Sequence, residues 1–147
     1  MAEPVSSYDR VGVLLRLVHS HWTLGIDAAL QHAGFDGIRP PHANVFPFVP
    51  DEGIQVAQLA RLTHVREQTM TQAVKELERM DYVERRPDPS DRRARLVFLT
   101  ARGQAVQPVA IAAGQQVEAR WAELVGQNDV DAIRGLLQRL VRALDTE

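Results

Sequence analysis

The chain has 147 residues, 45% of them hydrophobic, which is enough for one compact domain with a sizeable core. It contains no cysteine, and this excludes disulfides, thiolate nucleophiles and cysteine-based redox sensing. No apolar run approaches the ~18 residues of a membrane span, and residues 1–4 lack the basic start of a signal peptide, so we expect a cytoplasmic protein without a membrane partner.

Charge is distributed unevenly along the chain. The formal net charge is only −2, but residues 61–102 hold ten Arg and Lys against seven Asp and Glu, which makes this region +3 and the rest −5. A basic centre between acidic flanks is expected where the centre of a protein faces phosphate. The excess is small enough to arise from chance clustering.

Two segments precede the basic region. Apolar residues recur every three or four positions from Val11 to Leu30, which predicts a long amphipathic helix over about 8–33 that ends at Gly34. Residues 35–50 hold four prolines and three aromatic residues, and we expect a short or kinked helix over about 41–49 followed by a turn at 51–53.

A helix over 56–62, a break near 63–65 and a second helix over 66–80 predict a helix-turn-helix. Met70, Ala73, Val74 and Leu77 share the predicted inward face of the second helix. The outward face carries Gln68, Thr69, Gln72, Lys75 and Arg79. Amide and hydroxyl groups read base edges, but many small α-hairpins share this pattern, so alone it is weak.

An arginine-rich hairpin follows the second helix. Strands are predicted over 82–86 and 95–99, joined by a turn over 87–94 that is rich in Pro, Asp and Ser. Val83, Leu96 and Phe98 are expected to point inward while the arginines project. We expect Arg85 and Arg86 to pair with Asp88 or Glu84.

Two helices complete the chain. Thr100 is expected to cap a long helix that contains Pro108, and Asn128 or Asp129 is expected to cap the last one. Because nothing in the central unit is large enough to cover the apolar stripes of the first and last helices, they predict a symmetric homodimer.

The predicted fold class is therefore mainly α with a small β-hairpin wing (α+β). It is a single winged-helix domain over 1–147, with a DNA-binding winged helix-turn-helix at 51–100 and helical dimerisation arms at 8–33 and 104–147.

Several short motifs occur in this order: Leu59-Ala60, Leu77-Glu78, Tyr82-Val83-Glu84-Arg85, Asp88-Pro89, Asp91-Arg92-Arg93, and Leu99-Thr100 followed by Gly103. Through them the chain resembles MarR-type winged-helix transcriptional regulators over residues 8–145. The resemblance implies a homodimer that binds a pseudo-palindromic operator in double-stranded DNA, usually as a repressor, with small aromatic or phenolic acids often acting as the releasing ligand. The chain departs from the family pattern at Asp81, usually a glycine but tolerant of a left-handed backbone, and at Arg66, where a capping serine is common.

The candidate DNA-binding residues are Arg66, Gln68, Thr69, Thr71, Gln72, Lys75, Asp91, Arg92, Arg93 and Arg95. The amides and hydroxyl of Gln68, Thr69 and Gln72 are predicted to read bases. Arg93, fixed by Asp91, is predicted to enter a narrow minor groove.

The remaining hairpin arginines, Arg92 and Arg95, are predicted to contact phosphates. For both the helix and the hairpin the alternative is an ordinary solvated surface.

His19, Trp22, His42 and Phe46 are candidates for a ligand pocket at the junction of the first helix, the proline-rich segment and the DNA-binding unit, where the rings would bury an aromatic body. Packing around a satisfied histidine is an equally good interpretation. We expect no metal, since His19 and His21 point to different faces of their helix and the sequence has no His-x-x-x-His motif.

No cofactor and no enzymatic activity are expected. The sequence has no nucleophile elbow, no phosphate loop and no evident paired carboxylates. A winged-helix module that binds protein instead of DNA is the competing interpretation.

Overall fold

The computed structural model describes residues 7–147, so residues 1–4, on which the expectation of no signal peptide rests, lie outside the described residues. The elements in chain order are the 3-10 helix η1 (Ser7–Asp9), α1 (Val11–His32), α2 (Pro40–Ala43), the 3-10 helix η2 (Phe46–Phe48), α3 (Val56–Leu62), α4 (Glu67–Arg79), β1 (Val83–Asp88), β2 (Asp91–Leu99), α5 (Ala101–Val125) and α6 (Gln127–Leu144). None of the helices in residues 7–147 is long and apolar enough to cross a membrane.

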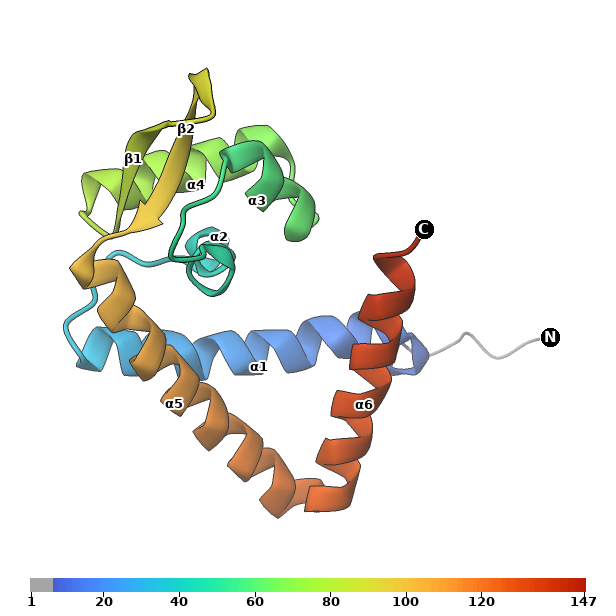
Figure 1. Ribbon diagram of the computed structural model, residues 1–147. Helices are drawn as coiled ribbons and strands as arrows, with labels where there is room; N and C mark the ends of the chain where they lie inside the picture. Colours follow the sequence, from blue (N-terminus) through green and yellow to red (C-terminus); the bar gives the residue numbers. More distant parts are fainter. Residues whose placement is uncertain (1–6) are drawn as a thin grey trace.

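The molecule has two parts, a head and a frame (Figure 1). The head contains α2, α3, α4 and the β1–β2 hairpin, and the frame is an open triangle made by α1, α5 and α6. Helix α1 contacts α5, and α6 turns back from the far end of α5. A helix-turn-helix followed by a hairpin confirms the predicted winged-helix fold.

The hydrophobic core lies mainly in the head. Met70, Ala73, Val74 and Leu77 are all buried, which confirms the predicted inward face of α4. Tyr82 is also buried, and its hydroxyl donates to the Asp36 carbonyl at 2.9 Å. A buried apolar face of this kind determines which face of α4 remains outside.

The proline-rich segment forms two short helices where one was predicted. Helix α2 begins at Pro40 and ends at Ala43, and η2 follows at Phe46–Phe48. Residues 44–45 separate the two helices, and Pro47 stands in the first turn of η2, where a missing backbone N–H is tolerated.

The two strands of the wing are longer than predicted, and their turn is shorter. They pair antiparallel out to Asp88 and Asp91, so Pro89 and Ser90 alone form the turn, in place of 87–94. The Asp88 carboxylate accepts hydrogen bonds from the Ser90 N–H at 2.9 Å and from the Ser90 hydroxyl at 2.7 Å. A side chain that bonds its own backbone two residues on closes a turn this tightly.

The residues of β2 that point inward also differ from the prediction. Val83 stands opposite Leu99, and Val97 is fully buried on the same face of the hairpin, whereas Leu96 and Phe98 point to the other face and are half-buried. A shift of one residue exchanges the two faces of a strand. On its other edge β2 is joined by Ile54, which pairs with Val97 through two backbone hydrogen bonds and extends the sheet by one residue pair.

Both ends of α5 are well defined. Thr100 caps its start as predicted, because its hydroxyl accepts from the Gly103 N–H at 3.1 Å. The helix continues through Pro108. At the far end the chain turns into α6 at Gly126, with φ of 96°, so the prediction that Asn128 or Asp129 would cap the last helix is wrong.

Candidate nucleic-acid interface

The exposed face of α4 carries the side chains that the sequence assigned to base contacts. Gln68, Thr69, Gln72 and Lys75 are exposed, and Thr71 is half-buried. Because the opposite face of α4 is packed in the core, these polar groups are presented outward on a helix that cannot roll freely.

The two ends of α4 show how the chain accommodates its departures from the family pattern. Arg66 precedes the helix with an extended backbone, and its side chain makes no capping hydrogen bond. Arg66 is exposed and directly precedes the N-terminus of α4, the end of a helix at which phosphates bind well. At the other end Asp81 has φ of 64°, so the left-handed turn expected there is confirmed.

The tip of the wing is anchored to the head by one buried carboxylate. Asp88 is 9% exposed and accepts a hydrogen bond from the Gln55 amide at 3.0 Å, next to the start of α3. The Gln55 bond, with those from Ser90, holds the pKa of Asp88 below its usual value. The wing tip therefore keeps a constant place relative to α3 at neutral pH.

Beyond this anchor the arginines of β2 project outward. The register passes from Asp88 opposite Asp91 to Pro87 opposite Arg95, so residues 92–94 bulge out of the ladder. Asp91 accepts a hydrogen bond from the backbone N–H of Arg93 at 3.0 Å, which orients the bulge.

The side chains of Arg92 and Arg93 are exposed on this bulge, whereas Arg95 donates to the Arg85 carbonyl at 3.0 Å. Of the predicted wing residues, Arg92 and Arg93 are thus brought to the tip, and Arg95 lies along the strands.

The other two arginines of the wing are held by carboxylates. Arg86 pairs with Glu84, as one of the predicted alternatives had it, and its guanidinium lies 4.4 Å from the centre of the Phe98 ring. Arg85 pairs with Glu78 of α4, with two hydrogen bonds of 3.0 Å, and this bond lowers the pKa of Glu78. The wing is therefore tied to the C-terminal half of α4.

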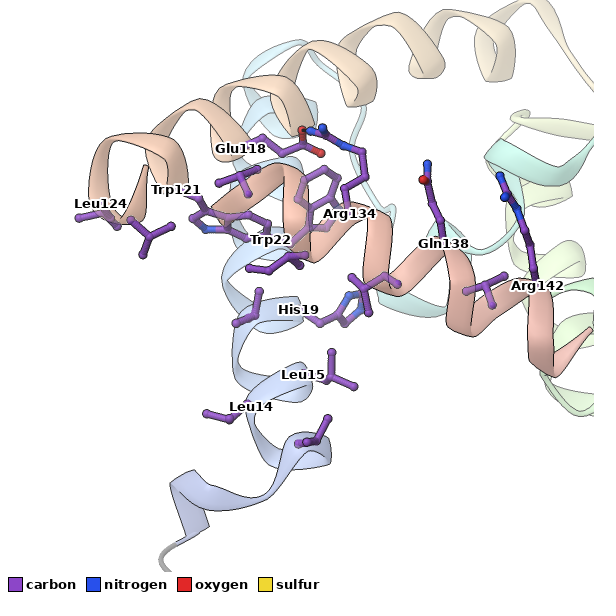
Figure 2. Close-up of a pocket in the computed structure, with 17 residues that line it drawn as sticks. Leu14, Leu15, His19, Trp22, Glu118, Trp121, Leu124, Arg134, Gln138 and Arg142 are labelled. Atoms are coloured by element: carbon purple, nitrogen blue, oxygen red, sulfur yellow. Dashed lines mark hydrogen bonds and ion pairs between the residues drawn. The ribbon is translucent and has the colours of Figure 1, made fainter. Parts of the chain in front are cut away.

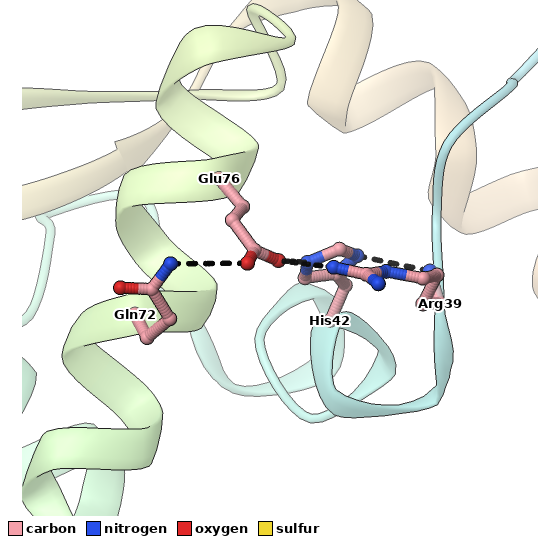
Figure 3. Close-up of polar contacts among 4 residues, drawn as sticks. All are labelled: Arg39, His42, Gln72 and Glu76. Atoms are coloured by element: carbon pink, nitrogen blue, oxygen red, sulfur yellow. Dashed lines mark hydrogen bonds and ion pairs between the residues drawn. The ribbon is translucent and has the colours of Figure 1, made fainter.

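A polar network joins α4 to the segment around α2 (Figure 3). The Gln72 amide donates to Glu76 Oε1 at 3.1 Å, and Glu76 Oε2 lies 2.6 Å from His42 Nε2 and 3.0 Å from Arg39 Nη2. The Arg39 backbone N–H donates to His42 Nδ1 at 2.9 Å, so the ring donates to Glu76 through Nε2. Hydrogen bonds from Gln72, His42 and Arg39 lower the pKa of Glu76 to about 2.

Comparison with known proteins assigns the family. A family model described as the MarR family matches residues 36–94, the span from the turn before α2 into the wing. The solved structure of CouR from Rhodococcus jostii RHA1, bound to p-coumaroyl-CoA, superposes with a TM-score of 0.72 at 26% identity and covers 94% of this chain and 96% of that one. These matches place residues 36–94 in the MarR family, and the likeness of fold extends over nearly the whole chain.

Two curated relatives agree with this assignment. BadR of Rhodopseudomonas palustris, named a transcriptional activatory protein, is 33% identical over 93 residues. That match covers 63% of this chain and 52% of BadR, so it spans about half the length of that relative. The transcriptional regulator HosA of Escherichia coli is 25% identical over 116 residues, which cover 79% of this chain and 86% of HosA.

A groove of about 820 Å³ runs between α1, α2, η2, α4 and α5. His19, Trp22 and Phe46 line it, as three of the four predicted pocket residues. The fourth, His42, is only 1% exposed and faces Glu76 instead. In residues 7–147 no group of three or more His, Asp or Glu lies close enough to hold a metal ion.

A second, larger cavity of about 1020 Å³ opens inside the triangle of the frame. Its lining is mostly apolar, and Figure 2 shows Leu14, Leu15 and Trp22 of α1 on one side and the helix α6 on the other. Arg134 of α6 pairs with Glu118 of α5 at its edge. Many apolar side chains of α1 and α6 around this cavity are exposed, among them Leu14, Leu15, Leu137 and Val141.

Sequence reasoning missed Arg39, Gln55 and Glu76 as parts of the site. Glu76 stands four residues after Gln72, a spacing that places two side chains together on a helix, and this was the available local signal. The partners from α2 and from the turn before α3 are 33 to 37 residues away in the chain, and no local pattern marks them.

Proposed function

We propose that this protein is a cytoplasmic, sequence-specific DNA-binding transcriptional regulator that acts as a homodimer on a pseudo-palindromic operator. The observation that carries the proposal is the combination of a polar exposed face on α4 with an arginine-bearing wing tip tied to the same head through Asp88 and Arg85. Amides and hydroxyls on a helix suit the major groove, and arginine suits phosphates or a narrow minor groove.

The homodimer is supported by the frame. Leu14, Leu15, Leu137 and Val141 expose apolar surface around one large cavity, and contiguous apolar surface of this kind marks an interaction site. In a dimer with a two-fold axis, the apolar residues of each frame would be covered by the same residues of the other copy. The two heads would then each bind one half-site of the operator.

A small aromatic ligand in the groove beside α2 is the proposed effector. Trp22 and Phe46 supply aromatic and apolar surface there, and the groove touches both α1 and α4. CouR, a relative in structure, is bound to p-coumaroyl-CoA, a ligand with an aromatic part.

The charges of the groove favour an uncharged or cationic aromatic ligand over a carboxylate. The charged lining residues Asp27 and Glu118 are acidic, and Glu118 is neutralised by Arg134. Calorimetry with benzylamine, benzyl alcohol and benzoate, on the wild type and on Asp27→Asn, measures this preference. Tight binding of benzoate alone would overturn it.

Repression that the ligand relieves is the proposed direction of control. In transcription from an operator-containing promoter, added protein is expected to lower the transcript and added ligand to restore it. A transcript that rises with protein would instead indicate activation, as the name of BadR states for that relative.

Selection of genomic DNA fragments by the purified protein tests the main proposal. A common inverted-repeat sequence is expected, and affinity should fall with salt at a log-log slope of about −0.9 for each phosphate neutralised. A protein that selects no sequence and binds no DNA at low salt would be better explained as a winged-helix module that binds protein.

A further inference from the structure

We propose that Glu76 is a positioning residue for base recognition: clamped by His42 and Arg39, its carboxylate holds the Gln72 amide in one orientation, and the base preference at Gln72 depends on it. The inference rests on the proposed DNA-binding function. It goes beyond that function because Glu76 is not one of the predicted DNA-binding residues and because it is held by His42 and Arg39, from a different segment of the chain.

Both carboxylate oxygens of Glu76 accept hydrogen bonds. Oε1 accepts from Gln72 on α4, while Oε2 accepts from His42 and Arg39 near α2 (Figure 3). The His42 ring is 1% exposed, and the Arg39 backbone N–H donates to it and sets its orientation. The carboxylate is therefore held by a donor that is itself buried and oriented. A single amide oxygen in place of the carboxylate would leave at least one of these donors without an acceptor.

This arrangement selects one of the two ways in which the Gln72 amide can point. With Nε2 on the carboxylate, Gln72 keeps its carbonyl oxygen and one N–H for other partners. Turned by half a rotation, the carbonyl oxygen would face the Glu76 carboxylate, and the two acceptors would repel. A glutamine that presents one N–H and one carbonyl side by side matches the N7 and N6 groups of adenine in the major groove.

The negative charge of Glu76 does not oppose DNA at this place. The Arg39 guanidinium, itself exposed, pairs with it at 3.0 Å, and Glu76 is only 18% exposed. The side chain therefore acts through Gln72 and adds no unpaired anion to the face that meets phosphate.

Selection from an operator library with one randomised base pair at a time tests the inference, using the full-length protein. The pair read by Gln72 is identified as the one at which Gln72→Ala loses its preference. Glu76→Gln is expected to lose about tenfold of the preference at that same pair and to keep it elsewhere, since one good side-chain contact accounts for roughly that factor. The double variant should lose no more than Gln72→Ala alone.

Glu67→Gln is the matched control. It removes the same charge from an exposed position in the first turn of α4, and it should leave every base preference unchanged. A mere clamp between α4 and α2 would instead make Glu76→Gln lower affinity equally for all sequences, and that result overturns the inference. So does an unchanged preference in Glu76→Gln.

Two further outcomes separate the inference from the function on which it rests. If the wild type selects an operator but Gln72→Ala changes no preference, the positioning role is overturned and DNA binding stands. If the wild type selects no sequence, both fail.

A measurement on the wild type avoids dependence on the folding of a variant. In the NMR spectrum one of the two Gln72 side-chain amide protons should exchange with water more slowly than its partner. Two Gln72 protons that exchange equally fast would overturn the inference.

Discussion

At the scale of single residues, Arg93 is one of the two arginines exposed at the tip of the wing. It lies on a bulge oriented by Asp91, and its side chain is exposed. The sequence predicted this pair from its two-residue spacing alone, because the contact is local. A groove contact for Arg93 stays a prediction.

We expect Arg93→Ala to weaken operator binding at least tenfold, or about 1.4 kcal/mol, and to leave the fold intact. The fold should stay intact because Arg93 is exposed and is not part of the core. A gel-shift titration measures the affinity. Arg120→Ala, which removes a positive charge from the frame far along α5, is the control and should bind normally; equal affinity of Arg93→Ala and wild type would reject the role.

A second prediction concerns how the stability of the protein depends on pH through Glu76. Its pKa in the folded protein, about 2, lies below the ordinary value of 4.5, so the stabilisation that it supplies is present above pH 4.5 and is lost as the pH falls toward 2. Urea unfolding of Glu76→Gln should therefore show a smaller loss of stability over this range than the wild type. Glu78 and Asp88 shift in the same direction and remain in both proteins, so only the difference between the two curves reports on Glu76. Parallel curves would contradict the prediction.

At the scale of elements, the junction of α4, the wing and α5 joins the head to the frame. Thr100 Oγ1 donates to the Asp81 carbonyl at 2.6 Å, and Arg102 donates to the Met80 carbonyl at 2.7 Å and stacks over the Tyr82 ring. A Cβ on Gly103 would lie 2.0 Å from the Tyr82 carbonyl oxygen, so the backbones meet directly here. The first turn of α5 is in this way fixed to the end of the DNA-binding unit.

Gly103→Ala is expected to destabilise the protein by about 1–3 kcal/mol, the usual cost of overpacking. The opposing atom is backbone and cannot swing away. Chemical denaturation gives the free energy of unfolding. Gly12→Ala, at a helical glycine with open space around it, is the control and should be neutral or slightly stabilising. Equal free energies of unfolding for the two variants would contradict the close backbone contact at the junction.

The helices and strands also show which features could be predicted from local sequence patterns. Helix existence, the inward face of α4 and the Thr100 cap were predicted correctly, because they follow from spacings within one or two turns. The inward-facing residues of β2 were not, because Val97 packs in a core whose other members come from segments as distant as Leu30 and Val106. The position of Asp88 depends in the same way on Gln55.

At the scale of the whole molecule, the exposed apolar surface of the frame predicts that the chain is dimeric in solution. Leu137→Glu puts a charge into the lining of the large cavity, and we expect it to yield a monomer in light scattering. Operator affinity should fall with it, because each half-site is then bound singly. Leu62→Glu, at an exposed leucine on α3 in the head, should stay dimeric; a wild type that is itself monomeric would refute the homodimer.

The sequence by itself determined the order of helices, the polar face of α4 and the arginines of the wing, since these depend on periodicity and composition over short windows. Only the tertiary structure decided that His42 contacts Glu76 and does not line the groove, and that Gln55 anchors Asp88 at the wing tip. The reason is physical. A hydrogen bond or a buried contact between segments more than 30 residues apart depends on how the chain packs, and no single stretch of sequence records that packing.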